Sequence, residues 1–274
     1  MTLTESVDDQ TSATRRRLFR RPSAATVVAI LAPVAFVALW AWRARTAPPL
    51  EVPDPQDVFA RSRDLLIGSE ANHTWTSMVR IVVSVLLALV VGSSLVFMAR
   101  LIPATETLVA KEILPVLNSI PSIGWAILGV IWFGVGNFAV IFVVTWILVP
   151  FCMVNMWEGL RSLDPGLIEM GRSFSRSDRR VLFRIQLPLL VPYLFASIRL
   201  SFSVGWKVAL IAEFFGAKSG LGLVMNRARQ SFDTATVFAS IVVVTVIIVV
   251  VERLIFDPLS EMFARRSGTL GVGR

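Results

Sequence analysis

The feature that most constrains the fold of this chain is a stretch of 45 residues, 113–157, without a single Asp, Glu, Lys or Arg. As one helix it would extend roughly 67 Å, whereas a helix needs about 20 residues to cross a ~30 Å hydrocarbon core. The stretch is therefore predicted to fold back on itself. The sequence Gly-Val-Gly-Asn at 134–137 is the obvious turn, and the stretch supplies two membrane-spanning helices.

Four further apolar stretches are long enough to cross a membrane, and they lie at 23–42, 81–99, 185–212 and 234–251. Only 17% of the residues are charged, against about 25% in a soluble domain. A soluble helical core is disfavoured because soluble helices show a polar face, and 234–251 shows almost none. A cleaved signal peptide is disfavoured for 23–42, since its apolar part is too long.

These observations predict an all-α, polytopic membrane protein with six transmembrane helices in a domain over 23–262. A cytoplasmic basic arm (1–22) precedes this domain and a cytoplasmic tail (263–274) follows it. The predicted spans are about 23–42, 75–99, 113–133, 138–157, 188–212 and 234–252.

The positions of Lys and Arg predict the orientation in the membrane. With the amino terminus in the cytoplasm, the inner segments hold 17 Lys and Arg residues and the outer segments hold 7. This asymmetry follows the positive-inside rule and favours both termini in the cytoplasm. Residues 43–72 and 214–233 then face outward, and 158–187 form the largest cytoplasmic loop.

The sequence lacks the residues and motifs that several kinds of chemistry require. Cys152 is the single cysteine and His73 the single histidine, so the sequence offers no internal disulfide and no Cys/His metal-ligand set. No Gly-Lys pair occurs, which excludes a phosphate-cradling loop, and no His-Glu-x-x-His or Gly-x-Ser-x-Gly motif occurs. The chain is therefore expected to bind no cofactor and to be no enzyme, and His73 is interpreted as a residue of the membrane interface.

The cytoplasmic loop has the pattern of a short helix-turn-helix. Asp164 followed by Pro165 fits a helix start, residues 175–178 break the pattern, and a second, basic helix is expected over 179–185. The first helix has one apolar face, made by Leu167, Met170, Gly171 and Phe174. Such a helix needs a partner for its exposed face, and both anionic lipid and another protein fit the pattern.

The spacing within this loop resembles the cytoplasmic signature of the permease subunits of ABC importers. That signature is Glu-Ala-Ala, three residues, Gly, nine residues and Ile-x-Leu-Pro. This chain has Glu-Met-Gly at 169–171, Ser at 175 and Ile-Gln-Leu-Pro at 185–188, so both gaps are intact while both alanines and the glycine are replaced. By this resemblance, the role of coupling to an ATPase falls to Asp164, Glu169, Gly171, Ser175, Ile185, Leu187 and Pro188.

Further stretches are similar to the nitrate/sulfonate/taurine-type permeases, the binding-protein-dependent transport system inner membrane components; they lie at 52–58, 77–80, 120–125, 132–137, 163–165 and 212–222. The resemblance implies a type I ABC importer permease fold in the bacterial plasma (inner) membrane. It implies import of a small anionic or polar solute, such as nitrate, a sulfonate, taurine or a small heterocycle. The implied partners are an ATP-binding cassette ATPase that binds ATP and Mg²⁺, an external solute-binding protein and a second permease copy, with a homodimer expected.

Polar residues inside a span usually face protein or water, so they indicate where a solute could pass. In the fifth span several of them lie within about an 80° arc, and others flank a stretch broken by Pro121. The candidates for the solute path are Arg199, Ser203, Trp206, Glu213, Asn118 and Ser122. The alternative for Arg199 is a network that only packs helices, and Arg80 and Lys207 are expected to extend towards lipid headgroups.

The alternative function for a chain of this kind is a secondary transporter driven by an ion gradient. Transporters of that class often contain inverted repeats with broken helices in matching halves. No convincing internal repeat is evident in this sequence, which favours the ATP-driven importer.

Overall fold

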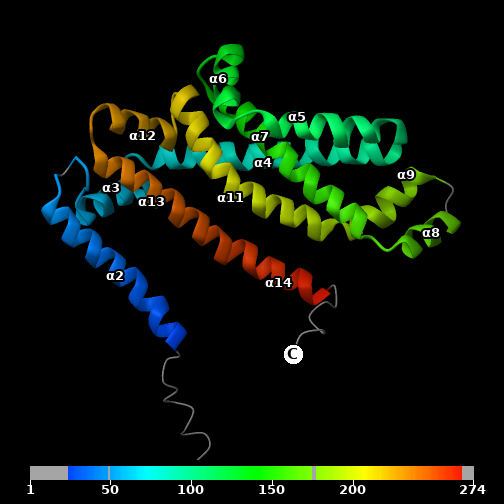
Figure 1. The fold of residues 1–274 in the computed structure, drawn as a ribbon, viewed down its shortest axis with the longest axis horizontal. Coiled ribbons are helices and arrows are strands. Elements are labelled where there is room, and N and C mark those ends of the chain that lie inside the picture. The colour runs from blue at the N-terminus through cyan, green and yellow to red at the C-terminus, as the bar shows by residue number, and fades with distance from the viewer. Residues whose placement is uncertain (1–23, 49, 175–176, 267–274) are drawn as a thin grey trace, which may run out of the picture. The chain divides into compact units, whose positions relative to one another are not determined.

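The computed structural model describes residues 24–48, 50–174 and 177–266, and every regular element in these ranges is a helix (Figure 1). The chain divides into two compact units, residues 1–55 and 56–274. The first unit holds α2 (Ala24–Thr46), whose Trp40 indole N–H donates to the backbone oxygen of Pro53 at 3.1 Å. The second unit holds the helices that position the candidate functional sites.

Three long helices form the centre of the second unit: α4 (Ala71–Leu101), α7 (Asn137–Ser162) and α11 (Val191–Gly216), each packed against the other two. They bury apolar side chains between them, including those of Ile81, Leu148 and Trp206. α4 and α7 pack closely at Gly92, where a Cβ atom would lie 2.9 Å from the Cβ of Cys152. A small residue at this contact lets the two helices pack tightly without needing a polar interaction.

The long uncharged stretch does fold back, and the turn predicted at 134–137 is confirmed. α6 (Ser122–Phe133) ends there and α7 begins at Asn137. Gly134 has a φ of 71°, a left-handed conformation that glycine adopts without steric cost. The Gly136 N–H donates to the backbone oxygen of Gly216 at 2.9 Å, which ties the turn to the end of α11.

The predicted span at 113–133 is not one straight helix. The first arm begins earlier, with the 3-10 turn η2 (Pro103–Thr105) and the π-helix η3 (Leu108–Ile113), and continues through α5 (Leu114–Ser119). α6 leaves this arm at 86°. The break lies at Ile120, whose extended backbone has a φ of −78° and a ψ of 118°. A residue before proline is disfavoured in the helical region, so Pro121 explains the bend.

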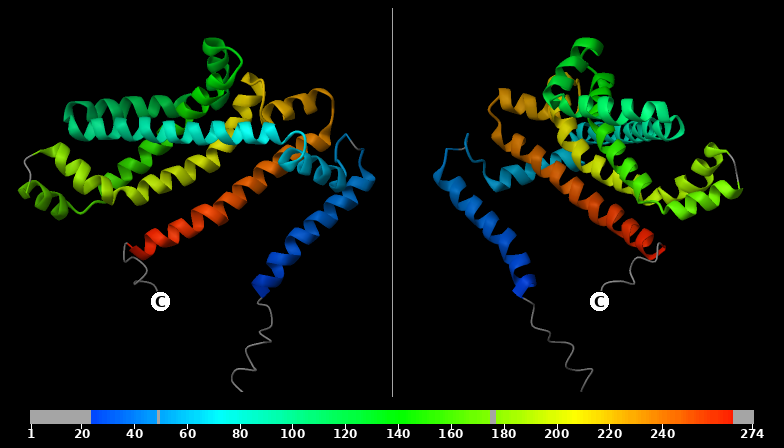
Figure 2. Two further views of the ribbon diagram at one scale, coloured as in Figure 1. Left: turned by 180° about the vertical axis from the view of Figure 1, so that it is seen from behind. Right: turned by 45° about the vertical axis from the view of Figure 1, so that its right-hand side comes forward.

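Short helices connect the long ones at opposite ends of the second unit (Figures 1 and 2). At one end α7 is joined to α11 by α8 (Pro165–Phe174), α9 (Asp178–Val181), the π-helix η4 (Leu182–Gln186) and α10 (Leu187–Leu189). We call this the α8 end. At the other end α12 (Leu221–Gln230) follows α11, and α3 (Pro55–Ile67) precedes α4. We call this the α12 end.

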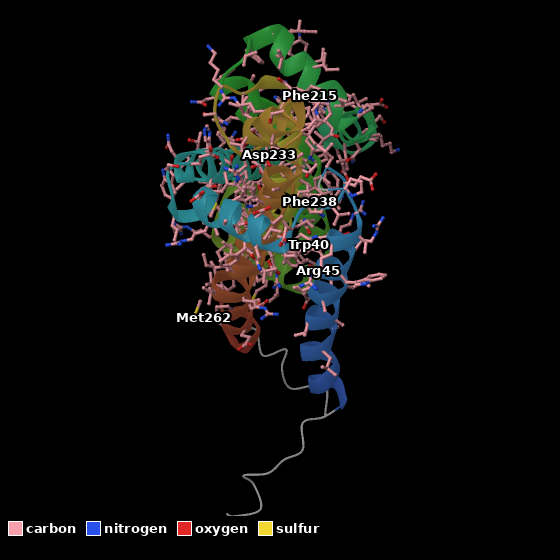
Figure 3. The ribbon with its side chains drawn as sticks, turned by 90° about the vertical axis from the view of Figure 1, so that its left-hand side faces the viewer. Trp40, Arg45, Phe215, Asp233, Phe238 and Met262 are labelled. Atoms are coloured by element: carbon pink, nitrogen blue, oxygen red, sulfur yellow. The ribbon has the colours of Figure 1, made fainter. Side chains whose placement is uncertain are left out.

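The last helix is continuous over three segments: α13 (Thr234–Val251), the π-helix η5 (Glu252–Phe256) and α14 (Asp257–Arg266). Asp233 and Met262 mark its two ends (Figure 3). Asp233 caps α13, because its carboxylate accepts hydrogen bonds from the Thr236 N–H at 3.1 Å and the Thr236 hydroxyl at 2.8 Å. Burial raises the pKa of Asp233, but these hydrogen bonds and the nearby Arg61 guanidinium outweigh that effect and leave the pKa below its ordinary value.

The cap at Asp233 leads to a prediction about acid stability. A carboxylate whose pKa is lower in the folded state stabilises the fold above its unfolded pKa of about 3.9, and this contribution is lost as the pH falls through the lower folded value. The melting temperature of the purified chain should therefore fall further between neutral pH and about pH 3 than that of Asp233→Asn, because the variant lacks this contribution at every pH. Parallel pH profiles for the two proteins would contradict this expectation.

Length and hydropathy identify four helices in the described residues that can cross a membrane, or five if the bent pair counts as one span. The four are Ala71–Leu101, Asn137–Ser162, Val191–Gly216 and Thr234–Met262. The predicted count of six is not reached by this criterion, because α2, which overlaps the predicted first span at 23–42, is not among them. The expected all-helical membrane fold is nevertheless confirmed.

Candidate functional site

The segment at the α8 end begins as the sequence predicts. The Asp164 carboxylate accepts a hydrogen bond from the Gly166 N–H at 2.8 Å, and α8 starts at Pro165. Three apolar side chains of α8 are exposed: Leu167 by 42%, Met170 by 56% and Phe174 by 87%. The helix therefore presents a nonpolar stripe that no described part of this chain covers.

Gly171 lies at the edge of the same face of α8, next to Leu167, and is buried. A Cβ atom at this position would collide with the Cδ1 of Ile185 in η4 and would lie 3.5 Å from the Cγ1 of Val181. Gly171 therefore packs closely against Ile185, and this contact joins α8 to the segment that leads into α11. The role of Gly171 in coupling stays a prediction. The Arg172 guanidinium reaches the Asp178 carboxylate at 3.3 Å across the turn between α8 and α9.

The other residues predicted to couple to an ATPase are spread along the same segment. The Glu169 side chain is exposed on α8. Leu187 and Pro188 form α10, directly before α11. Ser175 lies outside the described residues.

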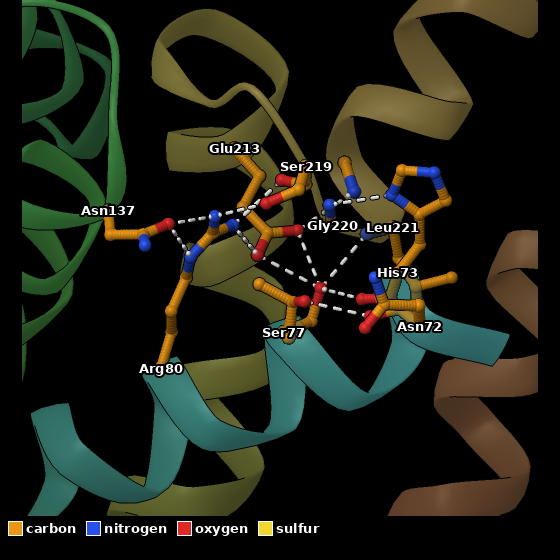
Figure 4. Close-up of polar contacts among 11 residues, drawn as sticks. Asn72, His73, Ser77, Arg80, Asn137, Glu213, Ser219, Gly220 and Leu221 are labelled. Carbon is orange, nitrogen blue, oxygen red and sulfur yellow. Dashed lines mark hydrogen bonds and ion pairs between the residues drawn. The ribbon is translucent and has the colours of Figure 1, made fainter. Parts of the chain in front are cut away.

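A second group of polar residues, at the α12 end, was not predicted as a unit. Arg80 on α4 and Glu213 on α11 form a buried ion pair with 2.7 Å between Nη1 and Oε1, and their side chains are 3% and 0% exposed (Figure 4). The same carboxylate accepts hydrogen bonds from the Ser77 hydroxyl at 2.8 Å and the Gly222 N–H at 3.0 Å. Glu213 thus has donors on three sides, which compensates for burying its charge.

Arg80 uses its remaining donors to hold two further elements. It donates to the Asn137 side-chain oxygen at the start of α7, and to the backbone oxygen and hydroxyl of Ser219, each at 2.7 Å. The expectation that Arg80 extends towards lipid headgroups is therefore wrong, because the side chain is buried and ion-paired. Burying a charge without a partner is costly, so the Glu213 carboxylate is what allows the Arg80 guanidinium to lie inside the protein.

The loop after α11 closes this network. Gly220 has a φ of 109°, a left-handed conformation suited to glycine, and its N–H donates to Nδ1 of His73 at 3.0 Å. The Leu221 N–H donates to the Ser77 hydroxyl at 2.9 Å. His73 is partly exposed, and its ring nitrogen accepts this hydrogen bond from the loop. We call Ser77, Arg80, Asn137, Glu213 and Ser219 the α12-end network.

The residues predicted for the solute path do not share one surface of this chain. Trp206 is fully buried, and Glu213 belongs to the α12-end network. Ser203 is partly exposed, and Asn118 and Ser122 lie on either side of the 86° bend. Their role in a path stays a prediction. Lys207, by contrast, is exposed as expected.

Arg199 is held by two carboxylates of the last helix. Its Nε donates to Glu252 at 2.6 Å and its Nη2 donates to Asp257 at 2.8 Å. Residues five apart diverge on an α-helix, but the π-helix η5 brings Glu252 and Asp257 onto the same side. These ion pairs agree with the alternative in which Arg199 packs helices.

Replacing Arg199 with glutamine is expected to loosen η5 and α14 from α11. The three side chains are 35%, 29% and 49% exposed, so each ion pair contributes no more than about 1 kcal/mol and the melting temperature should fall by about 2–4 °C. Hydrogen exchange in residues 252–262 should rise, while Lys207→Gln, the loss of an exposed cation on the same helix, should leave it unchanged. Equal exchange in both variants would contradict a clamping role.

Residues 96–267 match a family described as "Binding-protein-dependent transport system inner membrane component". The chain is 30% identical over 126 residues to an Escherichia coli K12 permease protein named for aliphatic sulfonates transport, an alignment that covers 46% of this chain and 48% of that protein. It is 25% identical over 210 residues to the taurine transport system permease protein of the same strain, with 74% and 76% covered. The aligned region therefore spans about half the length of the first relative and three quarters of the second.

A solved structure also resembles the fold. The inward-facing MetNI methionine ABC transporter has a chain that superposes with a TM-score of 0.57 at 19% identity, covering 70% of this chain and 94% of that one. At this level of identity the likeness concerns the fold alone.

Proposed function

Because this chain belongs to the family of binding-protein-dependent transport system inner membrane components, we propose that it is the membrane-embedded permease subunit of an ATP-driven importer. The proposed cargo is a small aliphatic sulfonate such as taurine, recognised through its negatively charged sulfonate group. The names of the two relatives support this class of solute. ATP hydrolysis, with its ATP and Mg²⁺, is assigned to a separate ATPase subunit.

The observation that carries the proposal is the exposed apolar stripe of α8. Side chains such as Phe174, which is 87% exposed, are unfavourable in water when they lie together on one helix face. A groove on a partner protein would receive Leu167, Met170 and Phe174 as successive anchors of an amphipathic helix. The intact spacing from Glu169 to Pro188 favours an ATPase as that partner.

The packing around α8 suggests how the partner's movement would reach the membrane. Gly171 sits against Ile185, and the chain continues from η4 through α10 directly into α11. A displacement of α8 would therefore act on α11, which carries Glu213 at its opposite end. The α12-end network would transmit this displacement to α4 and to the loop at Ser219.

The complete importer is proposed to contain two copies of this permease, two ATPase subunits and an external solute-binding protein. With both termini in the cytoplasm of a bacterium, the α8 end faces the cytoplasm and the α12 end faces outward. The solute-binding protein would dock at the α12 end. Alternating access would follow from closure of the ATPase pair beneath α8.

Reconstitution in liposomes tests this function. With the binding protein outside and ATP enclosed on the ATPase side, liposomes that contain the chain and its cognate ATPase should accumulate labelled taurine, and enclosed ADP should give no uptake. Dissipating ion gradients with ionophores should leave the rate unchanged. Uptake that proceeds without the ATPase and stops with ionophores would instead establish the alternative, a secondary transporter driven by an ion gradient.

The contact between Gly171 and Ile185 gives a graded prediction for coupling. Gly171→Ala should retain most ATP-dependent uptake, because the atom it meets is the end of a side chain that can rotate. Gly171→Val adds two more methyl groups to a buried site, where overpacking costs about 1–3 kcal/mol, so uptake should fall by roughly ten-fold or more. Uptake is measured per assembled complex, and equal uptake by the two variants would contradict a coupling role for this contact.

A further inference from the structure

A cavity of about 240 Å³ lies at the α8 end, between the end of α4, η2 and the end of α7. Its walls include the apolar side chains of Val96 and Leu160 and the charged side chains of Arg100, Arg161 and Glu106. The α8 segment does not line this cavity. It therefore does not belong to the coupling surface proposed above.

The cavity carries an excess of positive charge that the described part of the chain leaves unpaired. Arg80, Arg172 and Arg199 each have a carboxylate partner, whereas neither Arg100 nor Arg161 forms an ion pair with a described residue. The guanidinium carbon of Arg161 lies over the Trp157 ring, 5.8 Å from its centre, which is within the range of a cation–π interaction. A planar guanidinium held in this way is suited to bidentate binding of a phosphate oxygen pair.

The surroundings of the cavity indicate a lipid as the source of that phosphate. α4 and α7 are both among the helices that can cross a membrane, and both end at the α8 end (Figure 1). Val154, Trp157 and Arg161 follow one another along one face of α7 towards this end, and Val154 is 39% exposed. An apolar, an aromatic and a cationic side chain in this order match the acyl chain, the glycerol level and the phosphate of a phospholipid.

We infer that this cavity binds the headgroup of an anionic phospholipid, with its phosphate between Arg100 and Arg161 and its first acyl carbons against Val154. Glu106 lies on the same wall and keeps the net charge of the site at one positive unit, which matches a single phosphodiester. A zwitterionic headgroup such as phosphocholine would place a further cation beside the two arginines. The site is therefore expected to discriminate against phosphatidylcholine.

Native mass spectrometry of the full chain in neutral detergent tests this inference. Phosphatidylglycerol should be retained more strongly than phosphatidylcholine with the same acyl chains. Arg100→Gln and Arg161→Gln should each weaken phosphatidylglycerol retention by about five-fold, the effect of one basic residue near a charged lipid. Arg253→Gln is the matched control, because Arg253 is an exposed arginine on η5 outside the cavity.

Each other outcome overturns the inference. Equal weakening by all three substitutions would show a general charge effect, and equal retention of the two lipids would show that the headgroup is not recognised. Displacement of phosphatidylglycerol by millimolar inorganic phosphate would show a site for a free anion.

Trp157→Leu is a further variant for use if an arginine variant fails to fold. It keeps an apolar wall and should also weaken retention, because Arg161 loses its contact with the indole ring.

Discussion

Replacing Glu213 with alanine is expected to destabilise this protein by about 3–5 kcal/mol, the cost of leaving one member of a buried ion pair without its partner. Arg80 is 2% exposed, so its guanidinium cannot recover the lost interaction by moving into water. Ser77 and the Gly222 N–H lose their acceptor at the same time. The purified variant should show a much lower melting temperature, and little of it should accumulate in membranes.

Three comparison variants separate the ion pair from the loss of a negative charge in general. Glu70→Gln removes an exposed carboxylate directly before α4 and should have almost no effect. Arg80→Met should be about as damaging as Glu213→Ala. The double variant Arg80→Met with Glu213→Ala should lose less stability than the two single losses added together, because neither charge is then left unpaired. If the effects of the two single substitutions simply add, the pair is not energetically coupled.

The features that the sequence predicted well are local ones. A helix start at Asp164–Pro165 and a turn at 134–137 depend on residues within one or two positions of each other, and both are found in the structure. The contact of Gly171 with Ile185, fourteen positions further along the same loop, lies within the segment whose spacing resembles the signature. Long apolar stretches likewise predicted the helices that can span a membrane, because hydropathy is a property of each stretch by itself.

The features that the sequence did not predict depend on distant parts of the chain. Arg80 and Glu213 are 133 positions apart, and no periodicity within either helix says that they meet. The stretches that contain the two residues each resemble the family, but the resemblance of two separate stretches does not show that Arg80 and Glu213 are in contact. Arg199 illustrates the same limit, because its partners meet only through the π-helix at 252–256, and a π-helix has no simple sequence pattern.

The second large effect is expected on the exposed stripe of α8. Phe174→Asp should abolish stable association with the ATPase and lower ATP-dependent uptake by at least about a hundred-fold. Burying a phenylalanine contributes about 1.5–3 kcal/mol, and placing an unpaired carboxylate in the same groove adds a penalty of similar size. The two together exceed the roughly 2.7 kcal/mol that corresponds to a hundred-fold change in affinity. Copurification of the ATPase with the tagged permease measures the effect.

The fold should survive this substitution, which distinguishes it from Glu213→Ala. Phe174 is 87% exposed, so an aspartate there removes no packing within the chain and the melting temperature of the permease alone should not change. Phe59→Asp is the matched control for copurification, because Phe59 is 74% exposed on α3 at the α12 end. Phe174→Leu should keep the ATPase bound, since an apolar anchor remains. An ATPase that copurifies equally with Phe174→Asp and with the wild type would place the docking surface elsewhere than on α8.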